Sequence, residues 1–161
     1  KIPRLLSTYQ KIDAYTYPEE FEACDGSATV NPGVHVGQQT RQPFGLAYST
    51  IVGNDTQGDS FGEKLHLIYA ARVSPSERAY ETVNDSPEAI TFSWEYTTTP
   101  VDLTDIGLKP SAGITINKHE VTAEAWGALT DILYGTESEE PRLPSIQEVI
   151  ELTEPTVNPG A

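Results

Sequence analysis

The stretch of sequence that decides the fold reads AITFSWEYT and covers residues 89–97. Every second position carries an apolar or aromatic side chain, and these four candidate core anchors are Ile90, Phe92, Trp94 and Tyr96. The positions between them carry polar side chains, namely Thr91, Ser93, Glu95 and Thr97. Because a β-strand directs successive side chains to opposite faces, the alternation predicts a strand with one packed face and one hydrated face.

The composition restricts the class of protein. The chain has 161 residues, a length typical of one domain with a single core. Lys and Arg number 10 against 24 Asp and Glu, so the formal net charge is −14. This charge excludes ordinary nucleic-acid binding, which needs basic side chains to displace phosphate counterions, and attachment to anionic membranes. No run is long and apolar enough to span a bilayer, and the single Cys24 excludes an intrachain disulfide.

The remaining periodicity predicts a strand-rich chain that ends in helices. Further strands are expected over residues 11–17, 45–52, 65–73 and 112–117. Residues 29–36, broken by Pro32-Gly33, form either a weak strand or a bent pair. A helical turn is expected between Pro18 and Gly26. Thr122 caps an amphipathic helix that stops at Gly135, and Ser145 opens a capping box for a helix that runs through Leu152.

These elements predict the fold class and the domain organisation. We expect a β-dominated α+β domain over residues 1–154, built as a sandwich or open barrel of two packed antiparallel sheets with flanking C-terminal helices. Residues 155–161 are expected to form a flexible tail.

A polar segment over residues 53–62 separates two of the predicted strands and reads as an extended hairpin loop. Its polar residues include Asn54, Asp55, Thr56, Gln57 and Asp59. The acidic spacing, extended by Glu63, also resembles a calcium loop, although Ser60 stands where an EF-hand needs glycine. A solvated hairpin tip is the simpler interpretation.

No set of residues indicates catalysis. The three histidines, His35, His66 and His119, are scattered, and neither a Gly-rich phosphate loop nor a nucleophile elbow is present. We therefore expect a protein that is not an enzyme and that needs no cofactor and no metal.

Several stretches together resemble the major tail protein, or tail tube protein, of long-tailed siphophages of Gram-positive hosts. They are AYTYPEEFEACDG at residues 14–26, QPFGLAYSTIVGNDTQGDSFGEKLHLIY at 42–69, SPSERAYETVNDSPEAITFSWEYTTTPV at 74–101, and ILYGT followed by RLPSIQEVI within 123–150. The order and spacing of these stretches extend the likeness over most of the chain. Members of that family begin further upstream, so the start at Lys1, without any methionine, indicates a missing N-terminal segment.

The resemblance implies a structural virion protein that forms hexameric rings, which stack into the tail tube. Its partners would be other copies of itself, the tape measure, terminator and distal tail proteins, and viral DNA that passes through without specific binding. It would be assembled in the host cytoplasm and would remain in the phage tail, with no membrane contact.

The resemblance also suggests roles for the residues singled out above. The polar face of Thr91, Ser93, Glu95 and Thr97 would line the lumen, where negative charge repels DNA phosphates and lets the duplex slide. The segment over 53–62 would reach an adjacent ring. Two alternatives stay open: another ring-forming virion component, such as a terminator, neck or distal tail protein, and a calcium- or carbohydrate-binding β-sandwich.

Overall fold

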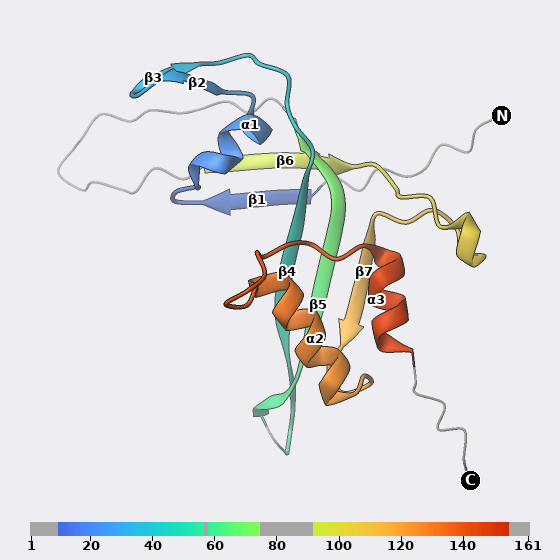
Figure 1. Cartoon of the computed structure of the whole chain (residues 1–161). Helices are drawn as coiled ribbons and strands as arrows, with labels where there is room; N and C mark the ends of the chain where they lie inside the picture. The colour runs from blue at the N-terminus through green and yellow to red at the C-terminus, as the bar shows by residue number, and fades with distance from the viewer. Residues whose placement is uncertain (1–9, 57, 75–91, 155–161) are drawn as a thin grey trace, which may run out of the picture. The chain divides into compact units, whose positions relative to one another are not determined.

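The computed structural model describes residues 10–56, 58–74 and 92–154 (Figure 1). The strands of the described chain are β1 (Gln10–Ala14), β2 (Ala28–Asn31), β3 (Val34–Val36), β4 (Phe44–Asn54), β5 (Gly58–Val73), β6 (Phe92–Thr98) and β7 (Gly113–Asn117). The helices are α1 (Glu22–Asp25), α2 (Ala123–Tyr134) and α3 (Ile146–Thr153), together with the short 3₁₀ turns η1 (Glu19–Phe21) and η2 (Thr104–Ile106).

β5 is the strand that connects the larger sheet. The strands follow the order β1-β6-β5-β4, and β7 also pairs with β5. Residues 64–68 of β5 pair with β7, whereas residues 71–73 pair with β6, both antiparallel. Between these two segments Ala70 has a φ of 49°, in the left-handed region that residues other than glycine seldom adopt. The change of partner therefore coincides with a break in the extended backbone of β5.

The chain divides into two compact units. Unit 1 contains Lys1–Phe44 and Ala70–Thr99, and unit 2 contains Gly45–Tyr69 and Pro100–Ala161. The boundary within β5 lies at Ala70, where the strand changes its partner. Each unit covers one face of its own strands with its own helical segments, and each is described separately below.

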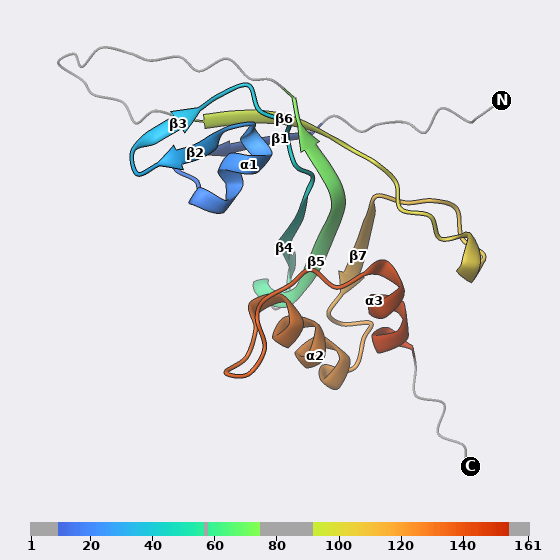
Figure 2. The ribbon, with the colours of Figure 1, turned by 45° about the horizontal axis from the view of Figure 1, so that its top comes forward.

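In unit 1 a short helical segment covers one face of β1 and β6. Register places Ile12 opposite Trp94 on this face. Phe21 of η1 meets the Trp94 ring edge-on at 5.2 Å between centroids. α1 then ends at Gly26, whose φ of 85° suits a residue without a Cβ. The bent pair predicted around Pro32-Gly33 is confirmed as the separate two-stranded sheet of β2 and β3, shown beside α1 in Figure 2.

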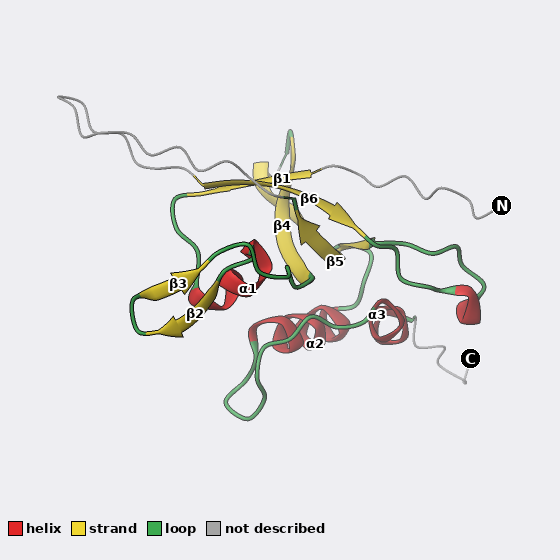
Figure 3. Ribbon diagram, turned by 90° about the horizontal axis from the view of Figure 1, so that it is seen from above, coloured by secondary structure: helices red, strands yellow, loops and turns green. Residues whose placement is uncertain are grey.

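In unit 2 two helices cover one face of β4, β5 and β7, as Figure 3 shows from above. The buried residues of this core are Leu65, Leu67, Tyr69, Leu103, Ile116, Leu129, Ile146 and Val149. Both predicted caps are confirmed: the Thr122 hydroxyl accepts from the Ala125 N–H, and the Ser145 hydroxyl accepts from the Glu148 N–H. The helices are therefore stabilised at their starts by local bonds and along their lengths by apolar burial.

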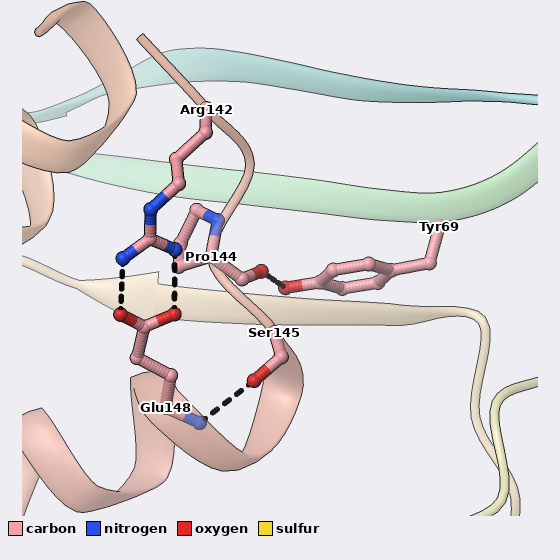
Figure 4. A network of polar contacts seen from close by, with 5 residues as sticks. All are labelled: Tyr69, Arg142, Pro144, Ser145 and Glu148. Atoms are coloured by element: carbon pink, nitrogen blue, oxygen red, sulfur yellow. Dashed lines mark hydrogen bonds and ion pairs between the residues drawn. The ribbon is translucent and has the colours of Figure 1, made fainter. Parts of the chain in front are cut away.

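A polar network holds the segment that leads into α3 against the strands of unit 2 (Figure 4). The buried Tyr69 hydroxyl donates to the Pro144 carbonyl at 2.8 Å. Burial raises the pKa of Tyr69 to about 12, and the carboxylate of Glu148 adds to the shift. Arg142 donates two bonds to the Glu148 carboxylate, at 2.8 and 2.6 Å. α3 is thus held against β5 in two ways: by the hydrogen bond from Tyr69 to the segment before the helix, and by the apolar face of the helix.

The predicted fold class is confirmed, because the chain is a strand-dominated α+β protein with antiparallel sheets and C-terminal helices. The hairpin loop predicted over 53–62 is shorter than expected. β4 continues to Asn54 and β5 begins at Gly58, so that Asp55 and Thr56 lie in the turn. Backbone pairing satisfies the N–H and C=O groups of polar residues as well as those of apolar ones, so a polar composition did not end the strands.

Candidate assembly surfaces

The polar side of β6 lies on the face of the unit 1 strands opposite the one that η1 and α1 cover. Antiparallel register places Lys11 opposite Glu95, Asp13 opposite Ser93, and Arg72 of β5 opposite Thr97. Residues directly opposite each other across an antiparallel pair share a face. Hydrogen bonds from Ser93 and then Lys11 lower the pKa of Asp13. Thr91, the remaining member of the predicted polar face, lies outside the described residues.

Among the described residues, the charges on this face of the strands are balanced. Lys11 and Arg72 supply two positive charges, and Asp13 and Glu95 supply two negative ones. Sequence alternation alone identified Glu95 but could not show that a lysine of another strand stands opposite it. The formal net charge of −14 is therefore not concentrated on the polar side of β6.

The apolar side of β6 is the covered face of unit 1, and the predicted anchors Trp94 and Tyr96 are confirmed as buried. Phe92 is half-buried and stacks on Trp94, while Ile90 lies outside the described residues. The Trp94 indole N–H donates to the buried Asp25 carboxylate at 2.8 Å. Sequence reasoning missed Asp25, although a buried tryptophan needs an acceptor for its N–H and an acid just before a helix-ending glycine was a candidate.

β4 is a long edge strand that exposes apolar side chains. It lies at one end of the strand order, so its second edge pairs with no other described strand. Ile51 is 70% exposed and Tyr48 is 42% exposed. A long edge strand with exposed apolar side chains is a template for pairing with another chain.

The tip of the β4–β5 hairpin carries the residues predicted to reach a neighbour. Asp55 and Thr56 are exposed in the turn. Asn54 belongs to β4 and Asp59 to β5, while Gln57 lies outside the described residues. Glu63, considered for a calcium loop, lies in β5 and accepts from Lys118 Nζ at 3.3 Å. No group of three or more His, Cys, Asp or Glu residues suited to a metal ion occurs in the described chain.

His66 joins three strands of unit 2 on the face opposite the one that α2 and α3 cover. Its Nε2 lies 2.9 Å from the Thr50 hydroxyl of β4, and its Nδ1 lies 3.0 Å from the Thr115 hydroxyl of β7. The ring also stacks on Tyr48 at 4.8 Å between centroids. These contacts link neighbouring strands across the sheet, which is a structural role that the scattered histidines did not reveal.

His35 lies beside a hollow of about 840 Å³ between the helical segment and the β2–β3 hairpin of unit 1. Its Nδ1 lies 3.0 Å from the Thr29 hydroxyl and 3.1 Å from Glu22 Oε1. A catalytic triad needs the carboxylate on one ring nitrogen and the nucleophile on the other. Here both partners share Nδ1, so this cluster lacks the arrangement of a proton relay.

Comparisons with known proteins add no relative: no family model, curated protein or solved structure matches the chain. Within the described ranges, no helix combines the length and the apolar character needed to cross a membrane.

Proposed function

We propose that this protein is a structural virion component whose copies form rings that stack into the tube of a phage tail. The observation that carries the proposal is the second edge of β4, which pairs with no described strand and presents Ile51 and Tyr48 to solvent. Pairing of this edge with a neighbouring copy would bury both side chains and satisfy the backbone groups of the strand. Six copies related by rotation would close a ring, and head-to-tail contacts along the axis would extend it.

The character of the uncovered faces supports the second part of the proposal, a channel through which DNA passes. Within the part of the chain that the structure describes, the polar side of β6 and the residues opposite it carry hydroxyl groups and two positive against two negative charges. A lining of this kind offers no net positive charge to displace phosphate counterions. The duplex would therefore slide and would not be held.

Electron microscopy of the purified protein tests the proposal. We expect tubes with a central channel. Isolated rings that never stack would favour a terminator, neck or distal tail component, and strictly monomeric protein at high concentration would overturn both interpretations.

A charge on the open edge tests the observation itself. Ile51→Lys should abolish ring formation while leaving the fold intact, because a lysine on an edge strand opposes strand pairing. Tyr134→Lys is the matched control, since Tyr134 is equally exposed but ends α2. If the Ile51→Lys variant formed rings as the wild type does, the edge of β4 would not be part of the contact between copies.

The lining is tested by the affinity of assembled tubes for duplex DNA. Glu95→Lys would give the polar side of β6 three positive charges against one negative charge in each copy, so these tubes should bind DNA in a salt-dependent manner. Asp105→Lys makes the same change of two charges on the exposed η2 turn and serves as the control. Equal DNA binding by both variants would contradict a lumen position for Glu95.

A further inference from the structure

The hollow of unit 1 leaves apolar side chains in contact with water. Its apolar lining comes from Ala23, Ala28, Val30 and Pro32. Val30 is 61% exposed, although it lies on the concave surface between the helical segment and the β2–β3 hairpin. A concave surface of this kind is a place where another segment can bury apolar side chains.

The same hollow is negatively charged. Its lining includes the carboxylates of Glu19, Glu20 and Glu22, and neither lysine nor arginine occurs among the described residues that line it. The Thr29 hydroxyl donates to Glu22 Oε2 at 2.7 Å, and His35 also contacts this carboxylate. In the described ranges, the exposed side chains of Glu19 and Glu20 form no ion pair. An occupant that matches this charge carries lysine or arginine beside its apolar side chains.

Residues 1–9 carry both the charge and the apolar side chains that suit this hollow. They read KIPRLLSTY, with two basic residues, no acidic residue and the aliphatic side chains of Ile2, Leu5 and Leu6. The other stretches outside the described residues have no positive net charge. Residues 75–91 contain one arginine against four acidic residues, and Gln57 and residues 155–161 carry no charge. Among these stretches only residues 1–9 are complementary to the hollow.

The length of residues 1–9 is sufficient to reach the hollow. β1 begins at Gln10, and only four residues separate its end at Ala14 from Glu19 in η1. The five residues of β1 extend over about 15 Å, whereas nine extended residues span up to about 30 Å. Residues 1–9 can therefore return past β1 and still leave about four residues for the hollow.

We infer that residues 1–9 dock in the hollow of their own chain. In this contact Ile2 covers the apolar lining, and Lys1 and Arg4 lie beside the carboxylates of Glu19 and Glu20. The attachment through β1 gives the segment a high effective concentration at the hollow, which offsets much of the entropic cost of docking. Because the contact lies within one chain, it does not depend on the proposed function.

Disulfide trapping in the full chain tests the contact. Under mild oxidation, Ile2→Cys combined with Val30→Cys should form a disulfide within one chain, which peptide mapping without reductant detects. Cys24 can stay in place because it is buried. Val36→Cys replaces Val30→Cys as the control and should give a several-fold lower yield, since Val36 is exposed on the same hairpin but does not line the hollow. Equal yields would overturn the inference, and so would a disulfide that forms only between chains.

A charge reversal gives a second test. Arg4→Glu should lower the yield of the disulfide between positions 2 and 30 several-fold, and Glu19→Lys in the same chain should restore part of it. Lys109→Glu makes the same reversal in the exposed segment after η2, so it serves as the control and should leave the yield unchanged. If Arg4→Glu lowered the yield no more than Lys109→Glu did, the carboxylates of the hollow would not attract residues 1–9, and the inference would be wrong.

Discussion

Units 1 and 2 each bury one face of their strands, but they do so with different side chains. Each covers one face of a few strands, but unit 1 does so with the short turns η1 and α1, while unit 2 uses α2 and α3. The ring contacts of unit 1 involve Tyr17, Phe21, Phe44, Phe92, Trp94 and Tyr96, and the core of unit 2 is mainly Leu, Ile and Val. Each aromatic ring buries more surface than an aliphatic side chain, so a shorter helical segment suffices.

The aromatic core of unit 1 brings polar groups into the interior that need hydrogen-bond partners, as the Tyr69 hydroxyl does in unit 2. Trp94 brings an N–H into the interior and needs Asp25 as its acceptor, and the Tyr96 hydroxyl donates to Gln10. The helices of unit 2 make polar contacts at their N-termini, where the hydroxyl groups of Thr122 and Ser145 cap them. Neither η1 nor α1 has a side-chain cap. Buried hydrogen bonds should therefore contribute more to the stability of unit 1, and apolar volume and caps more to that of unit 2.

The largest effect is expected from Leu67→Ala in unit 2. Leu67 is fully buried, and loss of its side chain should lower the free energy of unfolding by about 2–5 kcal/mol. Urea unfolding measures the change, and Tyr134→Ala at an exposed position should shift it by no more than about 0.5 kcal/mol. In the background Trp126→Phe, Trp94 is the only tryptophan and reports on unit 1. A Trp94 transition left unchanged by Leu67→Ala would show that the two units unfold separately.

Asp25→Ala tests the polar requirement of unit 1. The variant removes the acceptor of the Trp94 N–H inside the core, so a loss of about 1–3 kcal/mol in the free energy of unfolding is expected. Asp25→Asn keeps an acceptor oxygen and should lose less. If the alanine variant were as stable as the wild type in urea, the contrast drawn between the two units would be wrong.

Ser145→Ala tests the caps of unit 2. Without the hydroxyl that accepts from the Glu148 N–H, the free energy of unfolding should fall by about 1 kcal/mol. Ser138→Ala lies in the exposed loop before α3 and provides the matched control. Thermal unfolding of both variants measures the difference, and equal midpoints would show that the cap contributes nothing.

The smallest effect concerns the pH dependence of the Arg142–Glu148 pair. The bonds from Arg142 lower the pKa of Glu148 below its ordinary 4.5, so folding favours the ionised carboxyl. The contribution is complete above pH 4.5 and is lost as the pH falls through the folded pKa. Because the pair is largely exposed, its size should be at most about 1 kcal/mol.

Unfolding measured between pH 3 and 7, a range of about two units around the ordinary carboxyl pKa, checks this expectation. Glu148→Gln should flatten the acid side of the stability profile. Glu124→Gln changes an acid in the first turn of α2 and provides the control. If the Glu148→Gln variant had the same profile as the wild type, the Arg142–Glu148 pair would not contribute to the pH dependence of stability.

Local patterns were sufficient for most of the fold. Alternation located β6, and the hydroxyl residues Thr122 and Ser145 marked the starts of α2 and α3, because period and capping depend on neighbours in sequence. Turn residues marked the β2–β3 hairpin and the end of α1 for the same reason. The extent of the β4–β5 hairpin was misjudged, because turn-forming residues also fit a strand when the backbone has a partner.

The candidate surfaces were only partly predictable. The alternation identified the polar side of β6, but the balance of charge depends on Lys11 and Arg72, which come from strands far away in sequence. Likewise, nothing near residue 94 in the sequence points to Asp25 as its partner, since that pairing spans 69 positions. Assembly into a tube and residence in a virion stay predictions, as does the single domain over residues 1–154.

By itself the sequence determined the strand-rich α+β class, the starts of the helices and the two-sided character of β6. Each of these depends on residues that are close together in the sequence, within one or two helical turns or a few strand positions. Only the tertiary structure decided where β5 changes partner. The run IYAAR reads as uninterrupted strand, and alanine has no preference for the left-handed conformation that Ala70 adopts. That conformation lies between the segments that pair with β7 and with β6, and both pairings depend on hydrogen bonds between segments distant in sequence.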